Sequence, residues 1–371
     1  MKIAFIGGRD IHTLGGIEAY MFNLTRELAA LGHEPVVYCE SDHDSSTYEN
    51  GVKIITWVSP SSRFLCKPLL AFKSTWHAIR KEKVDFIHYN AWPPSLASVL
   101  ASLYGVPSCM EGHGLEWQRT KYSGFERKIM KMMERFTARL NRNLVMCSED
   151  QVEYFRKEYG RDSVCIHGAV NLPEENHDSS SDILGRFGLA PERFFLFMGR
   201  LVQDKNPDYL IRAFRASAHG DFKLVIAGDN PAMPDYVSGL HKLAAADKDI
   251  VFTGAVYGDD KRKLLENAYC FCIPSTIEGL SIVMLEASSY RLPTIASNIQ
   301  ANREFLGDDA VYVEVEDVES LRDALVFAIG NPSVLAGHAA RNYGKVATEY
   351  TWQKVALEYE AYVNDKVKKR A

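Results

Sequence analysis

The chain has 371 residues, of which 46% are hydrophobic and 25% charged, a composition typical of a soluble globular protein. One hydrophobic core rarely organises a chain of this length, so two domains are expected. The formal net charge of −5 argues against a general nucleic-acid-binding protein. The charge is uneven, because residues 1–171 carry 21 Lys and Arg against 19 Asp and Glu, which makes the N-terminal half the basic one.

The cysteines and the N-terminus indicate the compartment. The seven cysteines are odd in number, lie mostly in apolar strand-like runs and form no Cys-x-x-Cys pair. Buried free thiols in a reducing compartment are therefore expected instead of disulfides or metal ligands. The first ten residues are too short for a signal sequence, and no stretch approaches the length of a membrane span. We predict a cytoplasmic protein whose membrane contact, if any, is peripheral at the inner face of the plasma membrane.

Strand-like and helix-like segments alternate along the chain, which is typical of doubly wound α/β domains with parallel sheets. A segment rich in Ser, Asp and Asn, residues 171–182, has the composition of a linker. Two Rossmann-like domains are predicted, residues 1–175 and 176–351, followed by a helical tail over residues 352–371. The expected strands are Ile3–Gly7, Pro35–Cys39, Val52–Trp57, Val84–Tyr89, Pro107–Glu111, Asn143–Cys147, Val164–His167, Phe194–Met198, Phe222–Ala227, Ile250–Thr253, Cys270–Ile273, Thr294–Ser297 and Val311–Val313.

The first strand leads into a glycine-containing loop and a helix expected over Ile17–Leu31. Gly15 and Gly16 open this helix, where the missing side chains would let a ligand reach the backbone. Two adjacent glycines are as often simply a helix cap. The spacing is not Gly-x-Gly-x-x-Gly, and Glu40 stands only near the place of the acidic residue of a dinucleotide site, so a nicotinamide site is disfavoured without being excluded.

His113 lies between two glycines at the carboxyl end of the strand expected at Pro107–Glu111. Ligands of open α/β sheets bind at this end of the strands, which makes His113 a candidate ligand-binding residue. A single histidine is nevertheless more often structural than catalytic.

Residues 119–142 form a basic segment with eight Lys and Arg against two Asp and Glu, a local charge of +6. Its apolar residues recur at helical spacing and are expected to pack into the domain core, while the basic residues face outward. Such a cluster would attract an anionic bilayer by roughly 1 kcal/mol for each basic residue near the surface. The apolar residues of the segment are Phe125, Ile129, Met132, Met133, Phe136 and Leu140.

Two strand–loop–helix units in the second half suggest an anion site. Arg200 and Lys205 follow the strand Phe194–Met198, and two cations in one loop can bind two phosphates. Glu278 follows the strand Cys270–Ile273, and Glu286 lies inside the next helix. A helix starting near Gly279 would turn the free N–H groups of Gly279, Leu280 and Ser281 toward an anion. Either unit alone could be an ordinary polar loop, but their combination favours a phosphate site.

No metal site is predicted. Asp42 and Asp44 form an Asp-x-Asp pattern, but they lie in a polar loop without a matching carboxylate cluster, and a solvated turn is the preferred interpretation. The Asp-Asp pairs at residues 259–260 and 308–309 are interpreted as turn residues or helix caps.

Taken together, the Glu-x7-Glu pattern of Glu278 and Glu286, the Gly-Arg-x4-Lys pattern beginning at Gly199, and the Gly-Gly loop near the N-terminus resemble the family-4 retaining glycosyltransferases, which have the GT-B fold. The three motifs occur in the order of that family, between Met1 and about Trp352. The run from His113 to Lys121 is also similar to bacterial rhamnosyltransferases of polysaccharide assembly.

The resemblance implies a fold of two Rossmann-like domains facing a central cleft, with the tail crossing back to the first domain. It implies metal-independent transfer of a sugar from a nucleotide diphosphate to a glycan or lipid-linked saccharide. The nucleotide-diphosphate sugar is a co-substrate, and no other cofactor is expected. Arg200 and Lys205 would bind the diphosphate, Glu278 and His113 the donor sugar, and Glu286 the ribose. Further donor contacts would come from Gly15, Gly16, Gly199, Gly254, Val256, Gly279, Leu280 and Ser281, and acceptor contacts from Asp10, Glu18 and Arg119.

Three alternatives remain open at this point. A GT-B-like epimerase would turn over the nucleotide sugar without any acceptor. A non-catalytic sugar-nucleotide-binding protein would neither turn over the nucleotide sugar nor transfer the sugar to an acceptor. A dehydrogenase would change the absorbance of a nicotinamide. Among donors, dTDP-L-rhamnose is placed first because of the similarity to rhamnosyltransferases, and UDP-sugars are placed second.

Overall fold

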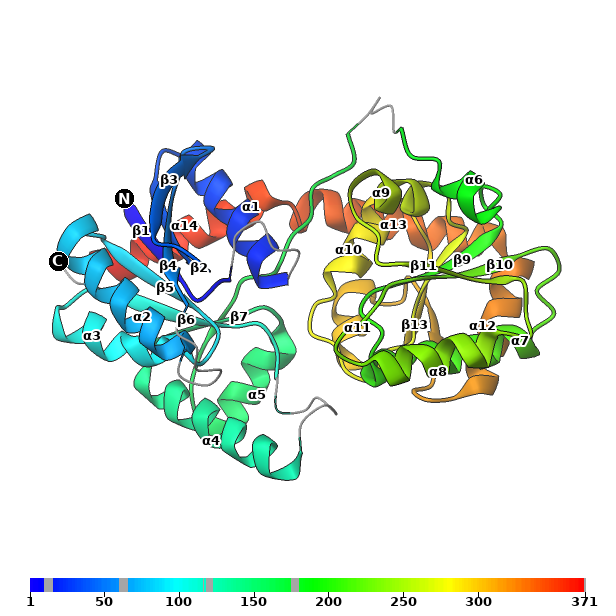
Figure 1. Ribbon diagram of the computed structural model, residues 1–371, viewed down its shortest axis with the longest axis horizontal. Coiled ribbons are helices and arrows are strands. Elements are labelled where there is room, and N and C mark those ends of the chain that lie inside the picture. The colour runs from blue at the N-terminus through cyan, green and yellow to red at the C-terminus, as the bar shows by residue number, and fades with distance from the viewer. Residues whose placement is uncertain (10–15, 60–65, 116, 118–122, 175–179, 370–371) are drawn as a thin grey trace. The chain divides into compact units, whose positions relative to one another are not determined.

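The computed structural model describes residues 1–9, 16–59, 66–115, 117, 123–174 and 180–369. The chain divides into two compact units (Figure 1). Unit 1 contains Met1–Ala169 together with Trp352–Ala371, and unit 2 contains Val170–Thr351. The first of the two chain segments in unit 1 thus ends at Ala169, whereas the boundary predicted from the sequence is residue 175.

In the described part of unit 1, eight strands form one sheet with the order β3-β4-β2-β1-β5-β6-β7-β8. All neighbours pair in parallel except β3 and β4, which are antiparallel. The sequence did not predict β3, because this edge strand is mostly exposed and has no apolar alternation. The strands are β1 (Lys2–Ile6), β2 (Glu34–Ser41), β3 (Ser45–Glu49), β4 (Val52–Val58), β5 (Phe86–Asn90), β6 (Ser108–Gly112), β7 (Asn143–Met146) and β8 (Val164–Cys165).

Helices cover both faces of the unit 1 sheet. Ile3 and Phe5 of β1 join a core cluster with α1 and α14, whereas Ala4 and Ile6 point into a separate cluster with α2 and α3. This alternation is what a strand buried on both faces requires. The helices are α1 (Gly16–Ala30), α2 (Cys66–His77), α3 (Ser98–Leu103), α4 (Gly124–Leu140), α5 (Glu149–Tyr159) and α14 (Trp352–Lys368), with short helical turns at Ala78–Glu82 and Pro94–Ala97.

The C-terminal helix α14 is an integral part of unit 1. It packs along α1, and the side chains of Trp352, Val355, Tyr359 and Val363 are buried in the same core cluster as β1. The helix reaches unit 1 after the whole of unit 2 has been completed, so the core of unit 1 depends on the two ends of the sequence.

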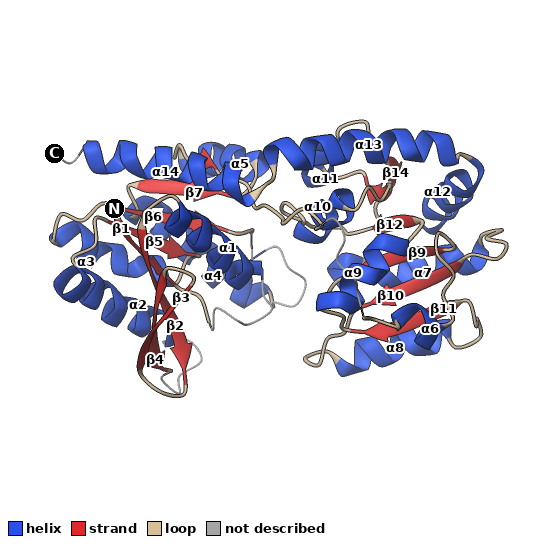
Figure 2. Ribbon diagram, turned by 90° about the horizontal axis from the view of Figure 1, so that it is seen from above, coloured by secondary structure: helices blue, strands red, loops and turns tan. Residues whose placement is uncertain are grey.

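Across the described residues of unit 2, six parallel strands are arranged in the order β11-β10-β9-β12-β13-β14, with helices beside the sheet (Figure 2). Alternate residues of β9 again enter two separate core clusters. The strands are β9 (Phe194–Met198), β10 (Lys223–Ala227), β11 (Ile250–Gly254), β12 (Cys270–Ile273), β13 (Thr294–Ser297) and β14 (Val311–Val313). The helices are α6 (Ile183–Phe187), α7 (Pro207–Ala216), α8 (Pro234–Ala244), α9 (Gly258–Asn267), α10 (Ile282–Ser289), α11 (Gln300–Leu306), α12 (Val318–Gly330) and α13 (Pro332–Glu349), with a 3-10 turn at Gln203–Lys205. The expectation of two parallel-sheet α/β domains is confirmed.

Each sheet contains a point where the strand order reverses. In unit 2 the chain runs outward from β9 to β10 and β11, then returns to β12 on the other side of β9. In unit 1 the corresponding reversal separates β1 from β5. Loops leave such neighbouring strands in opposite directions, and the crevice between them is where open α/β sheets bind ligands.

Four of the six apolar residues of α4 that were expected to pack into the core are exposed, whereas Met133 and Leu140 are half-buried. Phe125 is 73% exposed, Met132 62% and Phe136 56%. The residues that α4 does bury are Glu134, Thr137 and Ala138. Helical spacing identified an apolar stripe correctly, but spacing alone does not show which face of a helix meets the core. Within the described residues, no helix is both long and apolar enough to cross a bilayer.

The close packing of Gly228 against the loop after β9 can be tested by substitution. A Cβ atom at Gly228 would lie 1.9 Å from the backbone oxygen of Gly199. We expect Gly228→Ala to destabilise unit 2 by about 1–3 kcal/mol, because a well-packed backbone must shift. The control is Gly239→Ala in α8, where nothing lies within 4 Å and a gain of about 0.5–1 kcal/mol is expected. Urea unfolding measures both, and a Gly228→Ala protein as stable as the control contradicts the prediction.

Candidate active site

Lys205 and Glu278 meet at the strand-order reversal of unit 2. Lys205 lies in the loop that follows β9, and its Nζ donates to Oε1 of Glu278 at 2.7 Å. Ser275 Oγ donates to the same oxygen at 2.7 Å. The side chains of Lys205 and Glu278 are 19% and 11% exposed, so the pair has limited access to solvent. The sequence placed both residues in a donor site, and the structure brings them into direct contact.

The loops after β9 and β12 are joined by further hydrogen bonds. Asn206 is buried in the left-handed conformation with φ of 50°, and its Nδ2 donates to Pro274 O at 2.9 Å and Thr276 Oγ1 at 2.8 Å. The N–H of Thr276 donates to Asp204 O at 2.8 Å. These hydrogen bonds therefore hold the two loops together. Asn206 was not among the predicted residues, although an asparagine before the helix-starting Pro207 is a signal for a left-handed turn.

Arg200 and Gly199 begin the loop after β9. Gly199 has φ of 152°, and its N–H donates to Ala227 O at 3.0 Å. The side chain of Arg200 is exposed. Arg200 therefore adds an exposed guanidinium to the same loop as Lys205, and such a group can bind an anionic ligand.

The start of α10 differs from the expectation. The helix begins at Ile282, and Ser281 is its N-cap residue, whose backbone oxygen accepts from the N–H groups of Met284 and Leu285. Gly279 and Leu280 therefore lie in the loop before the helix and are not part of its first turn. The bonds that Glu278 makes to Lys205 and Ser275 hold this loop as a bend. The free N–H groups of the helix start are those of residues 281–283.

Glu286 is paired with Lys261, a residue that the sequence analysis did not single out. Lys261 Nζ lies 2.5 Å from Glu286 Oε1, and the side chains are 29% and 24% exposed. Lys261 belongs to α9, which follows the turn containing Gly254 and Val256. Gly254 ends β11 with φ of 73°, and Val256 packs partly buried against the core. No pattern in the sequence linked Lys261 to Glu286, because the two residues lie on different helices.

Unit 1 contains a cluster of ionisable side chains at the end of β6. His88 and Glu111 have no exposed surface, and His88 Nε2 lies 2.8 Å from Glu111 Oε2. His113 Nδ1 lies 3.8 Å from the other oxygen of Glu111, and its side chain is 18% exposed. Glu18, which is 8% exposed, accepts a hydrogen bond from the N–H of Arg9 at 3.2 Å.

The charges of this cluster follow from its surroundings. Burial alone would lower the pKa of His88, but the adjacent Cys109 sulfur and the Glu111 carboxylate outweigh it and raise the pKa to about 10. Burial lowers the pKa of His113, and Glu111 and Glu18 oppose this while the charge on His88 adds to it. His88 is therefore charged and His113 neutral at pH 7.

Family models match both units. Residues 14–173 match the model described as Glycosyltransferase Family 4, and residues 192–331 match the model described as Glycosyl transferases group 1. The chain is 32% identical to an uncharacterised glycosyltransferase of Methanocaldococcus jannaschii over 394 aligned positions, which cover 96% of each chain. This chain belongs to the family-4, group 1 glycosyltransferases.

Two further comparisons agree with this assignment. The glycosyltransferase is 28% identical over 279 aligned positions to an Escherichia coli enzyme named UDP-Gal:alpha-D-GlcNAc-diphosphoundecaprenol alpha-1,3-galactosyltransferase, covering 71% of this chain and 70% of that one. Its fold matches sucrose-phosphate synthase from Thermosynechococcus elongatus with a TM-score of 0.81, 17% identity and 98% coverage of each chain. The expected GT-B fold is confirmed.

The predicted acceptor-side residues Asp10 and Arg119 and the predicted donor-binding residue Gly15 lie outside the described residues. The donor-binding candidate Gly16 is the first residue of α1. The acceptor-side candidate Glu18 lies in the first turn of this helix, next to the cluster around His113.

Glu40, the residue weighed for a dinucleotide site, is engaged by its own chain. It lines a pocket at the carboxyl ends of β1, β2 and β4, and its carboxylate lies 2.9 Å from Lys67 Nζ and accepts from Ser59 Oγ at 3.2 Å. Lys67 also donates to Gly7 O at 3.2 Å. These contacts leave Glu40 poorly placed to accept hydrogen bonds from the ribose of a nicotinamide cofactor.

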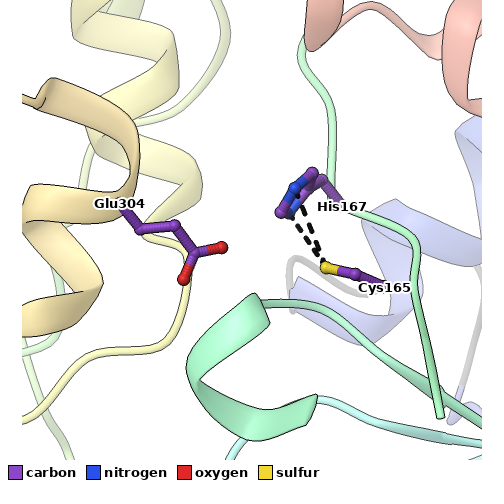
Figure 3. A group of neighbouring side chains, drawn as sticks. All are labelled: Cys165, His167 and Glu304. Carbon is purple, nitrogen blue, oxygen red and sulfur yellow. Dashed lines mark hydrogen bonds between the residues drawn. The ribbon is translucent and has the colours of Figure 1, made fainter. Parts of the chain in front are cut away.

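Cys165 and His167, two residues of types that can bind a metal, lie side by side near the end of β8 (Figure 3). Cys165 Sγ is 3.6 Å from His167 Nδ1 and 3.7 Å from Nε2, and Nδ1 lies 3.2 Å from Cys147 O. Glu304, also drawn in Figure 3, belongs to α11 of unit 2. Among the described residues, no three metal-ligating side chains of a single unit converge. All seven cysteines are described, and each is a free thiol.

Proposed function

We propose that this glycosyltransferase moves a sugar, with retention of anomeric configuration, from a nucleoside diphosphate to a lipid-linked saccharide during synthesis of a cell-surface polysaccharide. The observation that carries the proposal is the Lys205–Glu278 pair at the strand-order reversal of unit 2, with the exposed Arg200 in the same loop. This arrangement offers cations for phosphates beside a carboxylate for hydroxyl groups. Retention is proposed from the Glu-x7-Glu and Gly-Arg-x4-Lys resemblance.

Cleavage of the donor leaves negative charge on the β-phosphate, so catalysis requires fixed cations and N–H dipoles at that position. Arg200 and Lys205 supply the cations in this proposal. The free N–H groups at the start of α10, residues 281–283, and the loop glycine Gly279 supply dipoles. Because these partners neutralise the diphosphate without a cation from solution, we propose metal-independent transfer with the nucleotide sugar as the only co-substrate.

Two carboxylates recognise the sugars of the donor in this proposal. A carboxylate suits a diol because it accepts two hydrogen bonds. Glu278 binds hydroxyls of the transferred sugar, and Glu286 binds the ribose, each held in place by a lysine. The backbone of Gly254 and Val256, at the end of β11, binds the base.

Unit 1 is proposed to bind the acceptor through Asp10, Glu18 and Arg119, and its His113 is proposed to reach a hydroxyl of the donor sugar. Support for a lipid-linked acceptor comes from the name of the E. coli relative, which specifies a saccharide on diphosphoundecaprenol. An epimerase remains the principal alternative, and consumption of donor in the absence of acceptor would identify it.

The surface of α4 supports peripheral membrane attachment. The helix carries exposed apolar side chains at Phe125, Ile129, Met132 and Phe136 together with basic residues, within a segment of charge +6. An amphipathic helix of this kind can lie in the headgroup region, where apolar insertion and attraction to anionic lipid act together. Attachment would bring a lipid-linked acceptor within reach.

We place dTDP-L-rhamnose first among donors because of the similarity of the run His113–Lys121 to rhamnosyltransferases. UDP-sugars come second, and the UDP-Gal in the name of the E. coli relative supports them. Rhamnose has no 6-hydroxyl, so with this donor His113 would contact another hydroxyl, a phosphate or the loop itself.

Removal of either proposed phosphate-binding cation should slow transfer strongly without unfolding the protein. We expect Arg200→Ala and Lys205→Met each to lower kcat/KM by roughly 10- to 100-fold, since a charge-assisted hydrogen bond contributes about 1.5–3 kcal/mol. The matched control is Arg215→Ala, an exposed arginine of α7 that bonds only Leu243 O in the described structure. Near-native turnover in both site variants rejects this assignment.

Chelation should leave activity unchanged. We expect equal transfer rates in EDTA, Mg²⁺ and Mn²⁺, because protein groups already neutralise the diphosphate. A rate that disappears with EDTA and returns with a divalent cation contradicts metal-independent transfer.

Membrane binding should depend on both charge and apolar surface. We expect co-sedimentation with anionic vesicles that weakens in 1 M salt, where the Debye length falls to about 3 Å. The double variant Phe125→Ser/Met132→Ser should reduce binding, whereas Leu357→Ser, an exposed leucine of α14, should not. Equal binding to neutral and anionic vesicles, or none to either, removes the proposal.

Donor identity can be decided by thermal shift. We expect dTDP-L-rhamnose to raise the melting temperature more than UDP-galactose or UDP-glucose at equal concentration, because only a bound ligand stabilises the folded state. Protection by a UDP-sugar and none by dTDP-L-rhamnose overturns the rhamnosyl assignment and leaves the glycosyltransferase assignment intact.

A further inference from the structure

Two fully buried ionisable side chains lie on neighbouring central strands of unit 1, and the proposed function gives them no role. His88 belongs to β5 and Glu111 to β6, and both are 0% exposed. A buried ion pair seldom stabilises a fold more than apolar side chains of the same size would. Because Glu111 lies two residues before His113, the pair is expected to have a role at the site around His113.

His88 is held rigidly in its position. The Phe5 ring stacks on the imidazole with centroids 5.0 Å apart, and Nδ1 lies 3.0 Å from the Tyr359 hydroxyl. Cys109 Sγ lies 3.4 Å from the same nitrogen. Nε2 lies 2.8 Å from Glu111 Oε2, an ion-pair distance at which neither atom has a hydrogen-bond partner of good geometry. Charge attraction from His88 therefore holds the Glu111 carboxylate beside the ring.

The second oxygen of Glu111 faces His113. Neither oxygen of Glu111 has a hydrogen-bond partner among the described residues, and Oε1 is the one that lies near His113, 3.8 Å from Nδ1. This separation is too long for a hydrogen bond, but it is close enough for the carboxylate to attract an N–H dipole and repel a lone pair. Tyr20 packs edge-on against the His113 ring at 5.4 Å and limits its rotation.

We propose that Glu111 is a positioning residue that keeps the proton of neutral His113 on Nδ1, so that Nε2 presents a lone pair to a sugar hydroxyl. The inference rests on the proposed function in placing His113 next to a sugar. Nε2 is buried and has no hydrogen-bond partner within the described part of the chain, and such an unpaired polar atom is accounted for if a ligand supplies the missing bond. The groups that face His113 are Glu111 and His88 of the sheet and Glu18 and Tyr20 of α1.

The opposite tautomer would put N–H on Nε2 and make His113 a donor at that position. Glu111→Gln should promote this change, because its amide can direct an N–H group at Nδ1 and the negative charge is gone. We expect kcat/KM to fall by roughly 10- to 100-fold, the usual consequence of removing a group that orients a functional histidine. Glu111→Asp keeps the charge and should recover part of the loss.

The direct test is the tautomer of His113 in the full-length protein at pH 7, read from long-range ¹H–¹⁵N correlation spectra with His113→Asn as the assignment control. The wild type is expected to show a neutral ring with the proton on Nδ1, and Glu111→Gln is expected to shift it toward Nε2. Glu82→Gln is the matched control, a carboxylate of unit 1 that pairs with Lys2 and Lys53 and should leave the His113 signals and kcat unchanged.

The wild-type spectrum decides the matter even if Glu111→Gln fails to fold. A wild-type ring protonated on Nε2 alone, or charged at pH 7, overturns the proposal. A tautomer shift in Glu111→Gln without any change in kcat/KM also overturns it. The spectra report the position of the proton whether or not the protein transfers a sugar. Absence of transfer in the wild type would therefore refute the proposed function, and the spectra would still decide the position of the proton on His113.

Discussion

The contact between the loops after β9 and β12 is the constraint on which the proposed donor site depends. The strand order reverses between these two strands, so their loops diverge, and only specific bonds can hold them together. Asn206 bridges them through two side-chain hydrogen bonds, and Lys205 bonds Glu278 across the crevice. The cation intended for a phosphate and the carboxylate intended for a sugar are therefore preorganised by the same backbone before any ligand arrives. Preorganised charge is the largest contribution that a protein can make to a reaction in which a phosphate leaves.

Lysine–carboxylate pairing recurs at the second carboxylate of the site. Glu286 is held by Lys261 from the neighbouring helix, as Glu278 is held by Lys205. Each lysine orients its carboxylate while leaving oxygen lone pairs for hydroxyl groups. In unit 1 a buried imidazolium, His88, plays the equivalent part for Glu111. In both units, therefore, a positively charged side chain held by the fold orients a carboxylate toward the place where a ligand is expected.

Much of the fold could be predicted from the sequence because buried parallel strands such as Phe194–Met198 are continuous apolar runs bounded by polar loops. The edge strand β3 could not, since its residues are exposed and polar. The site was predictable where short motifs carried it, as for Arg200 and Glu278. Lys261, Asn206 and the His88–Glu111 pair depend on contacts between segments distant in sequence, which no local pattern encodes. The exposed stripe of α4 was misjudged because periodicity does not tell a core-facing stripe from a free one.

The central claim, that a nucleoside diphosphate binds at the strand-order reversal of unit 2, is tested most directly by hydrogen–deuterium exchange. Exchange should be measured with and without saturating dTDP or UDP on the wild type. The account predicts slower exchange in peptides covering residues 199–206 and 275–283, because bound phosphates would protect the loop amides and the start of α10. Unchanged exchange in both segments, with protection in other parts of the chain, would contradict it.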